Sequence, residues 1–174
     1  MLKPDSLRRA LTEGLVDAAG VRFLERDPHR LAIFIDKGRI AGRATGSIGF
    51  EWRYRLQAIL TDFPASLVDS VALVVMLWLR EHQPETLLNH TSGNDAVIFE
   101  ADIIDADTID LALELELNEA VDARPRDTGG FDLVHRAEPN PTPPFDDVPD
   151  TTPIGQFYLG DALIFDNTPP LQDG

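Results

Sequence analysis

Residues 50–63 read FEWRYRLQAILTDF, a stretch in which apolar and polar side chains alternate. The apolar phase consists of Phe50, Trp52, Tyr54, Leu56 and Ala58, and the polar phase of Glu51, Arg53, Arg55 and Gln57. A period of two is typical of a β-strand with one buried face and one polar face. The stretch therefore predicts a long strand, and it raises the question of what its charged face contacts.

The length of this strand bears on that question. The alternation begins at Ile48 and ends near Thr61, so at about 3.3 Å per residue it spans roughly 46 Å. A compact body of about 120 residues is only roughly 35 Å across. We therefore expect the strand to bend, to bulge or to extend as an arm, and we expect its polar face to be a contact surface.

The remaining elements predict an α+β fold, in which a mixed or antiparallel sheet has two helices packed on one face. One helix is expected over residues 3–24, with Leu7, Leu11 and Leu15 on one face. The second is expected from Ser66 to His82, with an apolar stripe toward the core. Further strands are expected at residues 31–36, 96–103 and 108–120. The order is thus helix, two strands, helix, two strands.

The C-terminal third has a different composition. We expect a core over residues 1–121 and an extended linker over 122–153, with room for one short strand near 131–135. The stretch 139–153 contains six prolines, which makes a semi-rigid spacer. The stretch 154–174 is expected to be a hairpin arm, since Gly160 and Asp161 separate two apolar runs. Its docking residues would be Phe157, Tyr158, Leu163, Ile164 and Phe165.

The net charge of −15 is unevenly distributed. Residues 1–80 contain 12 Lys and Arg against 9 Asp and Glu, whereas residues 81–174 contain 3 against 21. The two parts could meet head to tail between identical subunits, or the acidic surface could simply keep the protein soluble. The overall acidity argues against sequence-specific nucleic-acid binding. The longest apolar run, residues 71–79, is too short to span a membrane.

No pattern of residues indicates catalysis, a metal or a cofactor. The four histidines lack metal-ligand spacing, and the absence of cysteine excludes thiolate chemistry and fits a reducing compartment. The glycine-rich stretch 37–49 lacks the lysine of a phosphate-binding P-loop. We expect it to be a hairpin loop that carries Lys37, Arg39 and Arg43. An enzyme is therefore the least favoured class.

Several segments, taken in order, resemble the tail completion protein R family of contractile-tailed temperate phages. They are LKPDSLRRAL, the FEWRYRL strand ending in TDF, WLREHQP, the acidic strand, the proline-rich stretch and the aromatic hairpin. The resemblance implies a structural protein of the virion, assembled in the host cytoplasm. It would form a ring, with six copies expected, that caps the head-proximal end of the tail tube.

Such a cap would stop growth of tube and sheath and help to join the head. Its implied partners are other copies of itself, the tube protein, the sheath protein and a neck or head completion protein. The expected interface residues are Lys37, Arg39, Arg43, Arg53, Arg55, Glu114 and Glu116. The arginines and glutamates could instead pair across strands within one subunit. The alternative function is an assembly chaperone or adaptor that leaves before the virion matures.

Overall fold

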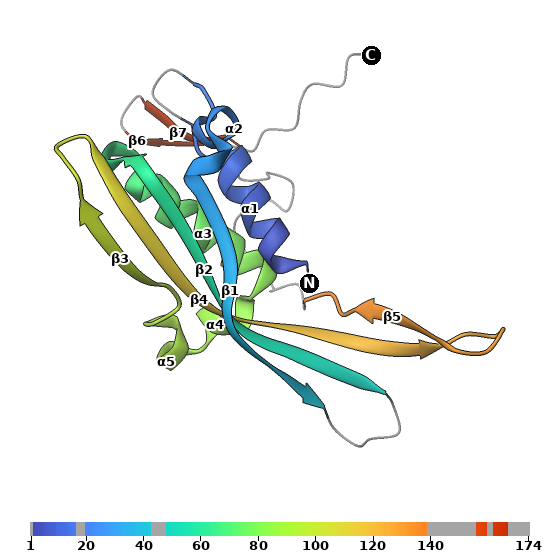
Figure 1. Ribbon diagram of the computed structural model, residues 1–174. Coiled ribbons are helices and arrows are strands. Elements are labelled where there is room, and N and C mark those ends of the chain that lie inside the picture. Colours follow the sequence, from blue (N-terminus) through green and yellow to red (C-terminus); the bar gives the residue numbers. More distant parts are fainter. Residues whose placement is uncertain (1, 17–19, 43–47, 139–155, 160–161, 167–174) are drawn as a thin grey trace, which may run out of the picture.

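The computed structural model describes residues 2–16, 20–42, 48–138, 156–159 and 162–166. The main elements are α1 (Lys3–Gly14), β1 (Leu31–Gly42), β2 (Gly49–Pro64), α3 (Val68–His82), β3 (Ile98–Ile103) and β4 (Thr108–Pro125). This order confirms the predicted α+β arrangement (Figure 1). Short helical segments lie between them: α2 (Phe23–Arg26), α4 (Pro84–Leu88), α5 (His90–Gly93) and 3₁₀ turns at Pro28–Arg30 and Ala65–Leu67.

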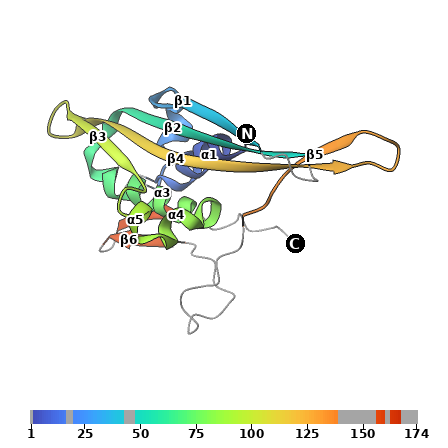
Figure 2. The same ribbon diagram turned by 90° about the horizontal axis from the view of Figure 1, so that it is seen from below.

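The sheet is antiparallel throughout and its strand order is β1-β2-β4-β3. The short strand predicted near residues 131–135 is confirmed as β5 (Phe131–His135), which pairs with the C-terminal end of β4. In Figure 2 the curled sheet forms one layer, with α1 and α3 on one of its faces. We call this the helix-facing side and the opposite one the outer face.

The first helix is shorter than predicted. It ends at Gly14, and Leu15 adopts extended backbone angles. Val16 then forms an isolated antiparallel bridge with Arg22. Gly20 has a positive φ of 75°, a conformation that glycine adopts without steric cost. The chain therefore reverses where the apolar pattern alone predicted a continuing helix.

The core lies between the two helices and the sheet. Leu7, Leu11 and Leu15, spaced four residues apart, are fully buried, as the helical pattern predicts. The apolar stripe of α3 is also buried and comprises Val71, Val74, Val75, Trp78 and Leu79. Each such side chain contributes about 1.5–3 kcal/mol when it is fully removed from water. Packing of this one stripe onto the sheet therefore accounts for the position of α3.

Two irregularities bend the long strands, as the strand length predicts. The pairing of β1 with β2 shifts between Ile35 and Lys37, and that of β2 with β4 shifts between Leu60 and Phe63. Asp62, in the second irregularity, has a φ of 45°. Beyond the first, the strands continue past the helices as a projection (Figures 1 and 2). We call this the arm, comprising residues 37–42, 49–55, 116–125 and 131–135.

The prediction that Lys37 and Arg39 lie in a loop is wrong, because β1 continues to Gly42. Its pairing with β2 runs without interruption from Lys37 to Gly42. Gly38 permits this close approach, since a Cβ atom at that position would lie 3.2 Å from the Cβ of Tyr54. Arg43 lies outside the described residues.

The C-terminal hairpin consists of β6 (Gln156–Leu159) and β7 (Ala162–Asp166). Phe157 pairs with Phe165, and Tyr158 with Leu163. The predicted antiparallel pair is thus confirmed, whereas its Gly160–Asp161 turn and the proline-rich stretch lie outside the described residues. β7 lies beside α1 and α3 of the same chain. Docking of this hairpin on a neighbouring subunit stays a prediction.

Candidate interaction surfaces of the sheet

The outer face of the arm carries a ladder of positive charges from two strands. Lys37 lies directly opposite Arg55, and Arg39 lies directly opposite Arg53. Like charges that face each other across two strands destabilise a sheet. The arrangement brings together four of the five cations expected at an interface.

Two of these cations are neutralised within the subunit. Both the Nε and a terminal nitrogen of Arg53 donate to Oε2 of Glu51, at 3.0 and 2.8 Å. Nε of Arg55 lies 3.1 Å from a carboxylate oxygen of each of Glu114 and Glu116. The hydrogen bond to Glu116 and the charge of Glu114 raise the pKa of Arg55. For Arg55, the cross-strand pairing left open by the sequence is therefore the arrangement in the structure.

Lys37 and Arg39 are exposed, and the described part of the chain offers neither of them an ion-pair partner. The carboxylates of Glu51, Glu114 and Glu116 are committed to Arg53 and Arg55. The edge strand β1 thus presents two unneutralised charges, two residues apart, at the border of the sheet.

The opposite border of the sheet is acidic. From Glu81 to Ala123 the sequence contains no lysine or arginine. This interval includes β3 and most of β4, and on their outer face Asp102 lies opposite Asp110. The two borders of one sheet therefore carry charges of opposite sign.

The helix-facing side is apolar beyond the region that the helices cover. Ile40 lies opposite Trp52 on the arm and is 62% exposed. Leu133 and Phe131 of β5 are also largely exposed. Exposed apolar surface of this kind is typical of sites that bind another protein. The apolar side chains that the alternation predicted to be buried are therefore only partly buried where the strands form the arm.

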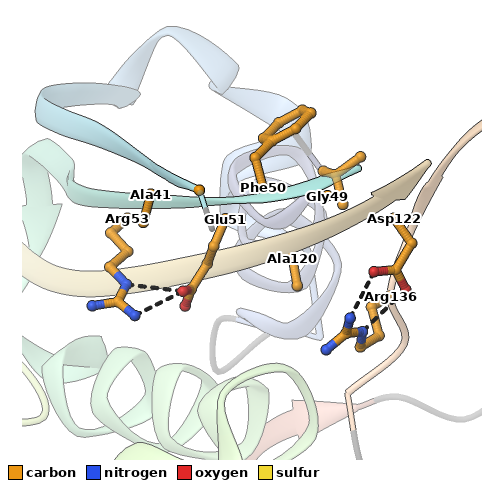
Figure 3. A pocket seen from close by; sticks show the side chains of 10 residues that line it. Ala41, Gly49, Phe50, Glu51, Arg53, Ala120, Asp122 and Arg136 are labelled. Atoms are coloured by element: carbon orange, nitrogen blue, oxygen red, sulfur yellow. Dashed lines mark hydrogen bonds and ion pairs between the residues drawn. The ribbon is translucent and has the colours of Figure 1, made fainter. Parts of the chain in front are cut away.

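A groove of about 520 Å³ lies in the arm, where β1 ends at Gly42 and β2 begins at Gly49 alongside β4 (Figure 3). Arg53 and Glu51 form one ion pair in its lining, and Arg136 and Asp122 form another, with nitrogen–oxygen distances of 2.8 and 2.6 Å. The hydrogen bond from Arg136 lowers the pKa of Asp122. Among the described residues that line the groove, each charged side chain is therefore already paired with another.

A buried polar cluster joins the arm to the helices, and sequence reasoning missed it. Glu119 is only 4% exposed. Its carboxylate accepts a hydrogen bond from the hydroxyl group of Tyr54 and another, at 2.8 Å, from the backbone amide of Leu2. Nδ1 of His135 lies 3.3 Å from the same carboxylate. Burial, reinforced by the bond to Glu119, raises the pKa of Tyr54 above its ordinary value.

Lys3 forms the second half of this cluster and is 6% exposed. Its Nζ donates to Gln83 at 2.6 Å and lies 2.6 Å from Oε1 of Glu138. Ser6 in the next turn accepts a hydrogen bond from the indole of Trp78 at 3.0 Å. The N-terminal motif LKPDSLRRAL therefore fastens α1 to α3 and to the segment that follows β5.

One signal in the sequence could have revealed this cluster. Glu119 stands in the same phase as Leu111, Leu113, Leu115, Leu117 and Val121, which are all buried. A carboxylate in the buried phase of a strand needs hydrogen-bond donors around it. The position of Glu119 in the apolar phase of residues 108–120 therefore indicates a buried carboxylate.

Within the described ranges, no group of three or more histidine, aspartate or glutamate side chains is placed to hold a metal ion. None of the helices described there is long and apolar enough to cross a membrane. The described residues present a charged outer face, an apolar margin that the helices leave uncovered and a projecting arm. Exposed surfaces of this kind are typical of the class of proteins that contact other macromolecules.

Comparison with known proteins agrees with this class. The family model "P2 phage tail completion protein R (GpR)" matches residues 1–139. Over 164 residues the chain is 38% identical to "Tail completion protein R" of Escherichia phage P2, covering 94% of this chain and 97% of that relative. The chain belongs to the P2 phage tail completion protein R family. No solved structure matches it.

Proposed function

We propose that this chain is a structural protein that closes the head-proximal end of a phage tail as a ring of identical subunits. One face of the ring would fit the last ring of the tail tube. The other would not template a further ring, so tube and sheath would stop growing. It would then form part of the surface to which the neck or head completion protein attaches.

The observation that carries this proposal is that the helices leave part of the sheet uncovered. The chain also belongs to a tail completion family. The apolar side of the sheet extends past the helices in the arm, where Ile40, Phe131 and Leu133 are exposed. A monomer that worked alone would gain stability by covering this surface. The uncovered sheet is explained if neighbouring subunits or the tube cover it after assembly. A catalytic role lacks comparable support, because the charges in the groove are already paired.

The experiment is negative-stain electron microscopy of tails assembled with and without this chain, with the intact gene supplied separately as the control. We expect tails of irregular length, or tails not joined to heads, when the chain is absent, and normal tails when it is restored. Normal, head-attached tails without the chain would overturn the proposal.

The alternative, an assembly chaperone, makes a different prediction about purified particles. A terminator stays at the tail end of the virion, so quantitative mass spectrometry should detect the chain in mature particles. Its absence there, together with defective tails, would favour the chaperone.

The hairpin β6–β7 is proposed to strengthen contact with a neighbouring subunit or the sheath. Deletion of residues 154–165 should leave the core folded, because the buried core cluster is built from residues between Leu7 and Leu117, but should weaken assembly. Unchanged tail completion by this deletion variant would argue against a role for the hairpin.

A further inference from the structure

Strand β3 lies at an edge of the sheet, and no helix in the described part of the chain covers its apolar side. Phe99 and Ile103 lie opposite Leu113 and Ile109, which are buried. Yet Phe99 is 67% exposed and Ile103 is 80% exposed. An edge strand with exposed apolar side chains is a template for pairing with another strand. In the described part of the chain β3 pairs only with β4, so its outer edge is open to such a partner.

The other side of β3 is charged. Glu100 and Asp102 lie on the outer face, two residues apart. Asp102 faces Asp110 across the strands, which is an unfavourable pair of like charges. A strand that brought two cations to this edge would relieve that repulsion.

The arm half of β1 has the matching pattern at the opposite border of the sheet. Lys37 and Arg39 lie on the outer face, two residues apart, while Ile40 lies on the helix-facing side. Edge-to-edge pairing keeps the two faces of a sheet aligned. If β1 met β3 antiparallel with Lys37 opposite Asp102 and Arg39 opposite Glu100, Ile40 would lie opposite Phe99 on the other side.

The directions of the strands also agree. Three antiparallel pairings separate β1 from β3, so the two strands run in opposite directions within one subunit. A rotation that preserves strand direction would place β1 of one copy antiparallel to β3 of the next. Because the contact joins two different patches, its repetition yields a closed ring or an open filament and not a two-fold dimer, and the proposed cap requires the closed ring.

We propose that the arm edge of β1 pairs with the β3 edge of a second copy of this chain, through Lys37 and Arg39 on one side and Glu100 and Asp102 on the other. This inference rests on the proposed ring. The contact continues the sheet from subunit to subunit, covers the exposed apolar edge and neutralises the two free cations.

Disulfide trapping tests the contact directly, because the native chain has no cysteine. Paired residues in neighbouring strands have the separation that a disulfide needs. Two full-length variants, Arg39→Cys with Glu100→Cys and Arg39→Cys with Asp102→Cys, sample neighbouring registers. After mild oxidation, in assembled particles and in concentrated protein, we expect a ladder of covalent multimers from at least one of them.

The matched control is Arg39→Cys with Asp69→Cys, since Asp69 is an exposed acid on α3, away from the edge. This control should give no ladder. A ladder of equal strength from the control, or no ladder from either edge variant in both preparations, would overturn the interface.

Charge reversal provides a second readout. Lys37→Glu with Arg39→Glu, and separately Glu100→Lys with Asp102→Lys, should each reduce normal-length tails by about tenfold or more, because like charges then meet. Combining all four changes in one chain should restore normal tails. Loss without rescue in folded protein, or no loss from either reversal, would contradict the contact.

The two proposals fail in different ways. Normal tails in the complete absence of the chain would refute the proposed capping function. Defective tails in the absence of the chain, together with normal tails from both charge-reversal variants, would refute only the proposed β1–β3 contact.

Discussion

The buried carboxylate of Glu119 accepts a hydrogen bond from the hydroxyl group of Tyr54 on the adjacent strand. The two residues lie where the sheet leaves the helices, and Glu119 also accepts from the backbone amide of Leu2. The bond thus links β2, β4 and the start of α1 at one point. A rigid junction of this kind would hold the arm at a fixed angle to the body.

Replacing Glu119 by alanine should destabilise the fold markedly. The change leaves the Tyr54 hydroxyl and the Leu2 amide without their acceptor in a buried site. We expect a loss of about 2 kcal/mol in the free energy of unfolding, measured by denaturant titration. The matched control is Glu116→Ala on the same strand, which removes only an exposed pair with Arg55 and should cost much less. Equal effects from the two variants would contradict the assigned role of Glu119.

Lys3→Met should also be destabilising, although it preserves the length of the side chain. It removes the ion pair with Glu138 and the hydrogen bond to Gln83. We expect a loss of about 1–3 kcal/mol by denaturant titration, because the partners are largely shielded from water. Lys37→Met, at an exposed lysine that faces Arg55, serves as control and should be neutral or slightly stabilising. A neutral Lys3→Met would mean that the N-terminal motif does not fasten the arm.

Gly38→Ala should destabilise the arm, whereas Gly42→Ala should not. A Cβ atom at residue 38 would crowd Tyr54, and Tyr54 is held by Glu119 and cannot yield easily. The expected loss is about 1–2 kcal/mol. At residue 42 a Cβ atom would meet nothing within 4 Å, so alanine should be neutral or slightly stabilising. Thermal unfolding of the two variants side by side would reveal the difference, and its absence would count against the close β1–β2 packing.

The ion pair between Asp122 and Arg136 should make stability depend on pH. The hydrogen bond from Arg136 lowers the pKa of Asp122 in the folded state. In the unfolded chain the pKa of an aspartate is about 3.9. The stabilisation is therefore complete above that unfolded value and is lost as the pH falls through the lower, folded value. Asp122→Asn should be less stable than the parent near neutral pH. The difference should shrink toward pH 3, and a constant difference across this range in denaturant titrations would refute the assignment.

The sequence predicts much of this fold because its patterns are local. The phases of residues 50–63 and 108–120 assign the buried faces of β2 and β4 correctly, and the spacing of Leu7, Leu11 and Leu15 assigns the buried face of α1. These patterns report which side of an element meets the core. They do not report where the helices stop covering the sheet.

The surfaces were harder to predict, because they depend on register. That Lys37 faces Arg55, and Arg39 faces Arg53, follows from one irregularity near Asp36, which composition does not reveal. The exposure of Phe99 depends on the extent of the helical layer, a tertiary property. Glu119 is hard to assign from the sequence for a third reason, since its two donors, Tyr54 and the backbone amide of Leu2, come from segments far apart in the chain.

The central claim is that copies of this chain close the head-proximal end of the tail. Cryo-electron microscopy of that end, in particles assembled with and without the chain, tests it most directly. The account predicts a closed ring of these subunits between the last tube ring and the neck, present only when the chain is supplied. An unchanged tail end in its absence, or the same subunits at another position in the particle, would contradict it.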